Sequence, residues 1–263
     1  MSEIVYARGF GAFADTPGAT LIDQSVRKLR NAIMSGELLP GQKLVEAKLG
    51  RDLDISRASL REALRVLEAE RLIQLLPNRG PSVAKLNYDD IVEIHDVWAM
   101  LTGEALYNFT ELAGAEDLSQ LDGVLKRLND SITVGASLDQ LEAINAFFAI
   151  VMAKCGNRVL AETVFGLLSR VNFLRAQAIL RPGWAALFAK EMAEIVAAVR
   201  SRSPDASRAA TRRHIDSACA AAKQIVLMSE PEPVRRGRRN AAGQDAKTPG
   251  ARAHSGISGR AAR

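Results

Sequence analysis

The sequence is poor in cysteine and in aromatic residues. Its two cysteines, Cys155 and Cys219, lie far apart in apolar segments with helical periodicity. This placement predicts two buried thiols rather than a disulfide or a metal-binding pair. Only 5% of the residues are aromatic, while alanine and leucine are plentiful, and this composition favours helices over a β-sandwich.

Long hydrophobic runs and a targeting segment are also missing. The first ten residues include Glu3 and have no sustained apolar core, so we expect no signal peptide. The longest apolar run, which contains Phe147 to Ala153, is far shorter than the roughly 20 residues that span a bilayer. We therefore expect a cytoplasmic protein without a membrane partner.

Positive charge is concentrated in two parts of the chain. Residues 230–263 contain eight Lys and Arg against three acids, and residues 20–86 contain twelve against eight, whereas the chain as a whole carries +5. The remaining residues are therefore net acidic. Two basic segments around an acidic middle predict a polyanionic partner.

The first third of the chain follows the order of a winged helix-turn-helix. Residues 1–19 lack periodicity and predict a flexible arm. Within 20–86, the patterns predict helices over 21–34, 46–53 and 57–70, with a type II turn at Pro40-Gly41. Two short strands around Asn78 and Gly80 then predict a β-hairpin, the wing.

From Asn87 to residue 229 every periodic segment is helical, which predicts an all-α bundle. The expected helices span about 88–113, 116–131, 137–155, 157–179, 183–202 and 204–228. The tail, 230–263, is rich in Gly, Pro and Arg and is predicted to be disordered, either adding nonspecific DNA affinity or serving only as a solubilising extension. The expected fold class is mainly α, with a winged helix-turn-helix followed by this bundle.

Helix 57–70 carries a stripe of arginines at positions i, i+4 and i+8, namely Arg57, Arg61 and Arg65. In a winged helix-turn-helix the start of this helix faces base edges, and arginine can bond guanine O6 and N7 together. Ser56 and Ser59 are candidates for phosphate contacts at the helix start. The alternative is that the arginines are merely solvated.

The hairpin supplies two further candidates for DNA contact. Arg79, at the wing tip, is placed to enter a narrow minor groove. Gly80 allows the backbone to approach closely. The complete predicted DNA-binding set is Ser56, Arg57, Ser59, Arg61, Arg65, Arg79 and Gly80.

Residues 29–86 contain three motifs in succession: I-x-x-G-x-L-x-P-G-x-x-L, D-I-S-R-x-x-L-R-E-A-L-R-x-L and P-N-R-G-x-x-V. With these motifs the segment resembles the GntR family of bacterial transcription regulators. The resemblance implies base contacts for Arg57 and Arg61 and a minor-groove position for Gly80. Two departures stand out: Ala47 replaces an arginine that contacts DNA in many members, and Arg71 replaces the glycine that follows the recognition helix.

Residues 90–225 resemble the FCD domain of the FadR-like branch, through F-F-x-x-V-x-x-x-C-G-N at 147–157 and R-x-H-I ending at Ile215. Many FCD domains hold a divalent metal with one Asp and three His. The resemblance places those ligands at Ile144, Phe148, Met192 and His214, of which only the last is a metal donor. We therefore expect neither a metal nor any other cofactor.

The resemblance also implies an effector pocket in the bundle. An arginine that grips effectors in many members is Trp98 here, so a carboxylate ligand would lose that clamp. The candidate effector-binding residues are Trp98, Asn145, Arg170, Asn172, Arg175 and His214. Apolar replacements at the metal positions favour a more hydrophobic effector, or a filled cavity. His95, beside Asp96, is predicted to form a surface pair.

These features predict a homodimer that binds a pseudo-palindromic, double-stranded DNA operator and responds to a small organic effector. The alternative is a DNA-binding protein whose helical domain only dimerises. We do not expect an enzyme, because the sequence offers no nucleophile–histidine pairing at sensible positions and no Gly-rich phosphate loop.

Overall fold

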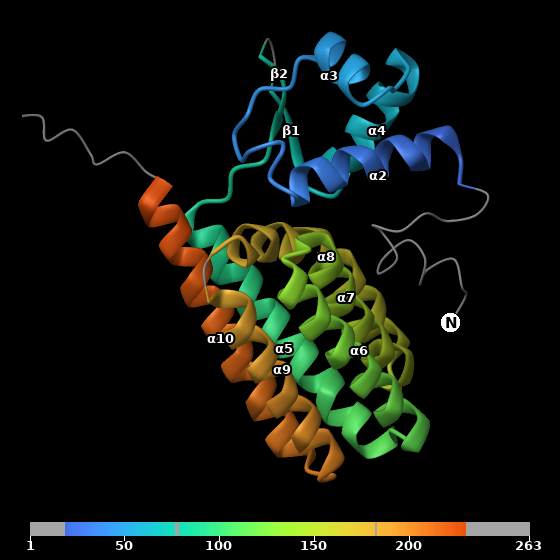
Figure 1. The fold of residues 1–263 in the computed structure, drawn as a ribbon, viewed down its shortest axis with the longest axis vertical. Helices are drawn as coiled ribbons and strands as arrows, with labels where there is room; N and C mark the ends of the chain where they lie inside the picture. Colours follow the sequence, from blue (N-terminus) through green and yellow to red (C-terminus); the bar gives the residue numbers. More distant parts are fainter. Residues whose placement is uncertain (1–18, 77–78, 182, 230–263) are drawn as a thin grey trace, which may run out of the picture. The chain divides into compact units, whose positions relative to one another are not determined.

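The computed structural model describes residues 19–76, 79–181 and 183–229 (Figure 1). Most of the predicted arm, the basic tail and Asn78 of the wing lie outside these residues. The described part consists of a small module that contains a β-hairpin and a bundle of helices. No helix in the described ranges is long and apolar enough to cross a membrane.

The winged helix-turn-helix forms in the predicted order. Its elements are α2 (Leu21–Met34), α3 (Glu46–Asp52), α4 (Arg57–Ala69), β1 (Ile73–Leu76) and β2 (Gly80–Val83). The two strands pair antiparallel, with Ile73 opposite Val83. Thr20 begins α2 with a capping box, in which its hydroxyl accepts the N–H of Asp23 at 3.1 Å and the Asp23 carboxylate accepts the N–H of Thr20.

The apolar stripes of α2 and α4 form the core of this module. Leu29 and Ile33 of α2 are fully buried, as are Leu60 and Leu67 of α4. Ile22, in contrast, is 40% exposed. Ile22 lies in the first turn of α2, before the first of the buried positions on that helix.

Two tight turns shape the module. Between α2 and α3, the N–H of Gln42 bonds the carbonyl of Leu39 at 2.9 Å, and Gly41 has φ of 77°, so the predicted type II turn forms. After α4, Arg71 adopts a left-handed φ of 59°, and Leu72 N–H bonds the carbonyl of Leu67 at 2.9 Å. The helix therefore ends with the bond pattern that glycine usually supports, although the residue is arginine.

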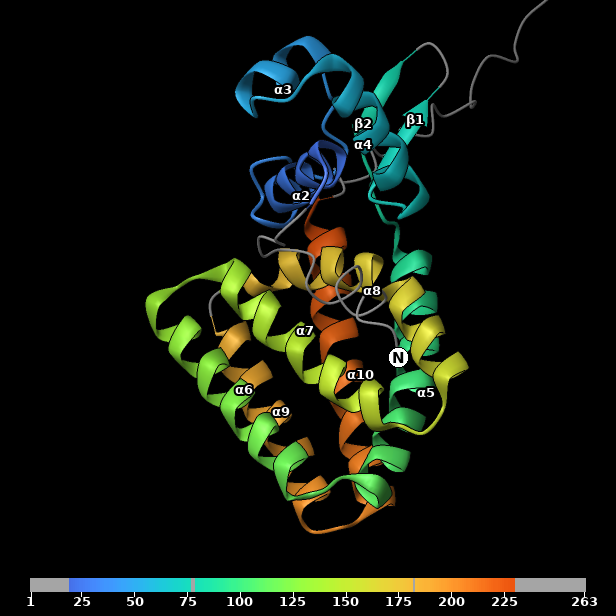
Figure 2. The same cartoon turned by 90° about the vertical axis from the view of Figure 1, so that its right-hand side faces the viewer.

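The bundle begins at Asn87, whose side chain caps the first helix. Its members are α5 (Tyr88–Leu112), α6 (Ala115–Val134), α7 (Ser137–Lys154), α8 (Arg158–Ile179), α9 (Trp184–Arg200) and α10 (Pro204–Ser229), and they lie side by side in Figure 2. The predicted helices match these bounds to within a few residues. The largest fully buried side chains of the bundle are Trp98, Phe109, Phe147 and Phe148.

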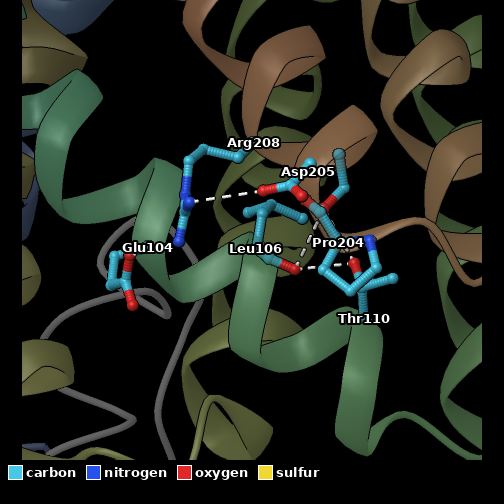
Figure 3. Close-up of polar contacts among 7 residues, drawn as sticks. Glu104, Leu106, Thr110, Pro204, Asp205 and Arg208 are labelled. Atoms are coloured by element: carbon cyan, nitrogen blue, oxygen red, sulfur yellow. Dashed lines mark hydrogen bonds and ion pairs between the residues drawn. The ribbon is translucent and has the colours of Figure 1, made fainter.

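Helix α10 packs along α5 through polar as well as apolar contacts (Figure 3). The guanidinium of Arg208 bonds the carboxylate of Glu104 at 2.7 Å, and a second nitrogen lies 3.5 Å from Asp205. Next to Arg208 on α10, the hydroxyl of Ser207 accepts a hydrogen bond from the hydroxyl of Thr110 on α5 at 2.9 Å. These contacts fix the register of the two helices that carry the candidate effector residues Trp98 and His214.

Both cysteines are free. Cys155 is buried at the end of α7, as predicted. Cys219 is only half-buried, so its predicted burial was wrong. The helical periodicity around Cys219 places it beside the packed face of α10 rather than within it.

Candidate functional site

The arginine stripe of α4 lies on the exposed side of the helix. Ser56 begins the helix, and its hydroxyl accepts the N–H of Ser59 at 3.1 Å. Arg57, the first helical residue, is exposed and forms no polar contact with the described part of the chain. Its guanidinium is therefore available to a ligand without breaking another contact.

The next two arginines are exposed but engaged in ion pairs. Arg61 Nε donates to Oε2 of Glu46 at 3.1 Å, and Arg65 Nη1 donates to Oε1 of Glu62 at 2.8 Å. Both arginine side chains are 70% exposed. Such surface pairs contribute about 0–1 kcal/mol, so they are readily exchanged for phosphate or base contacts. Sequence reasoning missed Glu46, because the fold alone brings α3 next to α4.

The wing presents Arg79 and Gly80 at the start of β2. Arg79 is exposed. Gly80 has φ of 76°, a left-handed conformation that side chains disfavour, and a Cβ placed there would meet nothing within 4 Å. The glycine is therefore required by the backbone conformation of the turn, and the open space leaves the backbone accessible.

A second candidate site lies inside the helical bundle, around Arg175 of α8. This side chain is 5% exposed, and its Nη1 donates to Oδ1 of Asn172 at 3.0 Å. The guanidinium carbon lies 5.5 Å from the ring centroid of Trp98 and 5.0 Å from that of Phe148. No carboxylate of the described residues pairs with it, and burial lowers the pKa of Arg175 to about 9.

Other polar groups in this region lack partners. Both side-chain polar atoms of Asn145 and the Nε1 of Trp98 are buried without a hydrogen-bond partner in the described residues. Asn145 lies one helical turn before Phe148 on α7, and Trp98 contacts Phe148 edge-on at 5.3 Å. An unsatisfied buried polar group costs about 1–3 kcal/mol, so these atoms would gain from a polar ligand.

His214 of α10 borders the same region. Its Nδ1 donates to Oε2 of Glu191 at 2.8 Å, and its ring meets Phe188 edge-on at 4.3 Å. Burial lowers the pKa of His214, and the charge of Arg175 adds to this effect, while Glu191 opposes it. We conclude that the imidazole is neutral near pH 7.

His95 of α5 was wrongly predicted to form a surface pair with Asp96. It is buried, and its Nδ1 donates to the carbonyl of Ile91 at 2.7 Å. Burial lowers the pKa of His95, and the charge of Arg175 contributes to that shift. Asp96 instead pairs with Arg212 of α10 at 3.2 Å. Adjacent residues on a helix point about 100° apart, so one is buried and the other exposed.

The structure brings five of the six effector candidates to the bundle interior. These are Trp98, Asn145, Asn172, Arg175 and His214, all buried. Arg170 lies about 140° round α8 from Arg175, and its Nε is buried without a partner in the described residues. It is therefore not grouped with the others. Many family members have an arginine at the position of Trp98; in this chain a guanidinium from a different helix, that of Arg175, lies 5.5 Å from the Trp98 ring centroid.

The metal-ligand positions implied by the FCD resemblance do not fit a metal. Ile144, Phe148 and Met192 are buried apolar side chains. His214 already uses Nδ1 on Glu191, which leaves a single nitrogen donor. Within the described residues, no group of three His, Cys, Asp or Glu side chains is placed to hold a metal ion. A divalent metal needs three or four such ligands.

Curated transcriptional regulators match between about half and three quarters of this chain. An HTH-type transcriptional regulator of Bacillus subtilis (strain 168), YdhC, is 23% identical over 204 residues, covering 77% of this chain and 91% of that protein. The transcriptional repressor GlaR of Escherichia coli (strain K12) is 29% identical over 157 residues, covering 56% of this chain and 70% of that protein.

Solved structures share the fold. Escherichia coli McbR/YncC superposes with a TM-score of 0.67 at 20% identity, covering 79% of this chain and 99% of that one. A GntR regulator from Rhodococcus sp. RHA1 gives a TM-score of 0.60 at 20% identity, covering 80% and 99%. At this identity the likeness concerns the fold alone.

Two family profiles match the chain in succession. Residues 21–83 match the gntR family of bacterial regulatory proteins, and residues 93–217 match the FCD domain. The first match contains the arginine helix and the wing, and the second contains the interior arginine. The chain therefore belongs to the GntR family of bacterial regulatory proteins and carries an FCD domain after its winged helix-turn-helix.

Proposed function

We propose that this chain is a dimeric, sequence-specific regulator whose FCD domain senses a small organic carboxylate without using a metal. As a GntR-family protein it is a DNA-binding transcriptional regulator. The finer proposal rests on one observation: Arg175 carries a buried positive charge that no carboxylate of the described residues balances.

For DNA binding, we assign α4 to the major groove. Arg57 and Arg61 are the proposed base contacts, and Arg79 is the proposed minor-groove residue. In support of this, all three side chains are exposed, and none of them has a buried partner among the residues that the structure describes. Ser56, Ser59, Arg65 and Gly80 are proposed to contact the backbone of the DNA.

A dimer would present two such helices to a pseudo-palindromic operator. One module reads only a few base pairs, and a twofold axis doubles the length of the site. The protein would act in the cytoplasm, where the bacterial DNA lies. Sedimentation equilibrium tests the dimer directly, since a monomer at micromolar concentration would contradict it.

The ligand class follows from the chemistry around Arg175. A buried guanidinium requires an anion or a hydrogen-bond acceptor, and a carboxylate can take two of its donors together. Trp98 and Phe148 would contact the rest of the ligand, which favours an apolar or planar body. The unpartnered Nε1 of Trp98 and amide of Asn145 supply further polar contacts.

A second candidate function has an observation in its favour. The aromatic contacts around Phe148, at 5.3 Å and 5.4 Å, show a closely packed interior. The FCD domain would then only dimerise, with the guanidinium held by ring faces and Asn172. This alternative predicts that no small molecule stabilises the protein.

A thermal-shift experiment with matched ligand pairs separates the two. The probes are benzoate, phenylacetate and hexanoate, each beside the corresponding alcohol. A ligand at 100 times its Kd adds about 2.7 kcal/mol to the free energy of unfolding, which raises the Tm by roughly 5–10 °C. We expect this shift from at least one carboxylate and from no alcohol.

The Arg175→Met variant provides the control. Methionine fills a similar volume without the cost of a buried charge, so the variant should fold. It should lose the carboxylate response. Arg200→Met, which removes an exposed arginine of α9, should retain it. Silence of all three carboxylates with the unaltered protein would favour the dimerisation-only function.

A further inference from the structure

Glu70, the residue that ends α4, is hydrogen-bonded to both parts of the molecule. Its Oε1 accepts from Nη2 of Arg30 at 2.6 Å, and its Oε2 accepts from Nε of the same arginine at 3.2 Å. Its Oε2 also accepts from the hydroxyl of Ser169, on α8, at 3.0 Å. We propose that Ser169 is the positioning residue through which a change in the FCD interior reaches the DNA-recognition helix. That this change is caused by ligand binding rests on the proposed function.

Helix α8 has one face toward the winged module and another toward the interior. Ser169 and Leu180 lie about 20° apart on the helix. Ser169 bonds Glu70, and Leu180 lies 3.4 Å from the position of a Cβ on Gly36, just after α2. Asn172 and Arg175 lie about 60° and 120° from Ser169, on the side that faces the bundle interior.

Ser169 and Arg175 lie close together along the axis of α8. Arg175 is six residues beyond Ser169, which corresponds to about 9 Å at 1.5 Å per residue. A helix transmits a shift over this distance as a rigid body, because its backbone bonds are continuous. A displacement of α8 caused at Arg175 therefore displaces the hydroxyl of Ser169 as well.

Glu70, the partner of Ser169, is itself held in place by Arg30. The side chains of Arg30 and Glu70 are only 10% and 25% exposed, and their two bonds tie the end of α4 to α2. The bond from Ser169 thus acts on the helix pair rather than on a loose side chain. A hydrogen bond of 3.0 Å is lost when the atoms move about 0.6 Å or more apart, so the contact has two distinct states.

The test uses amide hydrogen exchange on the full chain and needs no ligand. Arg175→Met changes a side chain of α8 that faces the bundle interior, and Ser169→Ala removes the hydroxyl that bonds Glu70. In the unaltered background, Arg175→Met should change exchange of amides 68–72 by at least about twofold, the size of a typical coupling between contacting residues. In the Ser169→Ala background, the same substitution should leave those amides unchanged.

Two further variants separate coupling from general stabilisation. Ser169→Thr keeps the hydroxyl and should restore the response of amides 68–72. Thr163→Ala removes a hydroxyl from an exposed position of α8, where it bonds only the carbonyl of Val159 within the described residues, and should leave the response intact.

An equal effect of Arg175→Met with and without Ser169, or no effect in either background, would overturn the inference. Failure of the proposed function has a different signature, because it appears only in the thermal-shift experiment with carboxylates. The two outcomes can therefore be told apart.

Discussion

Replacement of Arg57 by alanine is expected to weaken sequence-specific DNA binding by about 1–3 kcal/mol, which is the value of one bidentate base contact. This corresponds to a roughly 5- to 150-fold increase in Kd. Arg57 forms no polar contact with the described part of the chain, so no competing bond reduces this value. The loss should appear in full.

Arg61 differs, because it must first leave Glu46. An exposed pair of this kind contributes about 0–1 kcal/mol, so Arg61→Ala should cost up to about 1 kcal/mol less than Arg57→Ala. The structure thereby ranks two arginines that the sequence places on the same stripe.

The assay is fluorescence anisotropy with two labelled duplexes, one selected by the protein from a random library and one with the same bases in permuted order. Arg158→Ala is the matched control. Arg158 is the first residue of α8, after the capping residue Asn157, just as Arg57 is the first of α4 after Ser56. The Arg158→Ala variant should bind both duplexes with the same affinity as the unaltered protein.

The selected duplex should lose affinity and the permuted duplex should change little. An equal loss on both duplexes would show that Arg57 contacts phosphate instead of bases. Unchanged affinity for the selected duplex would refute the assignment of α4 to the major groove.

Three further predictions concern stability. Arg71→Gly should raise the free energy of unfolding, measured in urea, by up to about 1 kcal/mol. A left-handed residue other than glycine costs roughly 1–2 kcal/mol, and glycine recovers most of this although it gains more freedom in the unfolded chain. A lower free energy of unfolding in the variant would contradict the claim that Arg71 is strained. Burial lowers the pKa of His214 below its ordinary value of 6.5, so the contribution of neutral His214 to the free energy of unfolding is fully present above pH 6.5 and is lost as the pH falls below it. His214→Gln should therefore make the fall in the free energy of unfolding less steep, by up to about 1.4 kcal/mol per pH unit. Identical pH profiles for the two proteins would refute the assignment of a neutral imidazole. A chelator should change the Tm by less than about 1 °C, because the donor set cannot hold a metal, and a reversible loss restored by Zn²⁺ would overturn that reading.

Periodicity was sufficient to predict the helices and the wing, because apolar spacing marks the elements and several of them begin or end at a clear capping or turn residue. Asn87 and the turn at Gly41 are examples. The hydrophobic side of α4 fixed the direction of its arginines. These are local properties, which the sequence carries directly.

Contacts between elements were not predictable in the same way. The prediction for His95 failed because helical spacing alone did not reveal that this side of α5 is buried in the bundle. Arg170 and Arg175 look alike in sequence, and only packing separates them. The same limit applies to Glu46 and Ser169, whose partners lie on other elements.

Arg71 shows a different limit. Arginine stands where the family has glycine, so the sequence alone did not indicate how α4 ends. The structure holds arginine in the left-handed conformation, with the terminating bond intact. On either side of Arg71, the hydrogen-bonded Glu70 and the fully buried Leu72 hold the turn in place, so the arginine adopts the strained conformation.

The central claim is that a carboxylate bound at Arg175 changes the affinity for DNA. The most direct test is the anisotropy of the selected duplex at increasing concentration of the carboxylate that gives the largest thermal shift. We predict a change in Kd of about 5- to 150-fold for the unaltered protein, and less than about twofold for Arg175→Met. A carboxylate that binds without changing the Kd, or that changes it equally in Arg175→Met, would contradict the claim.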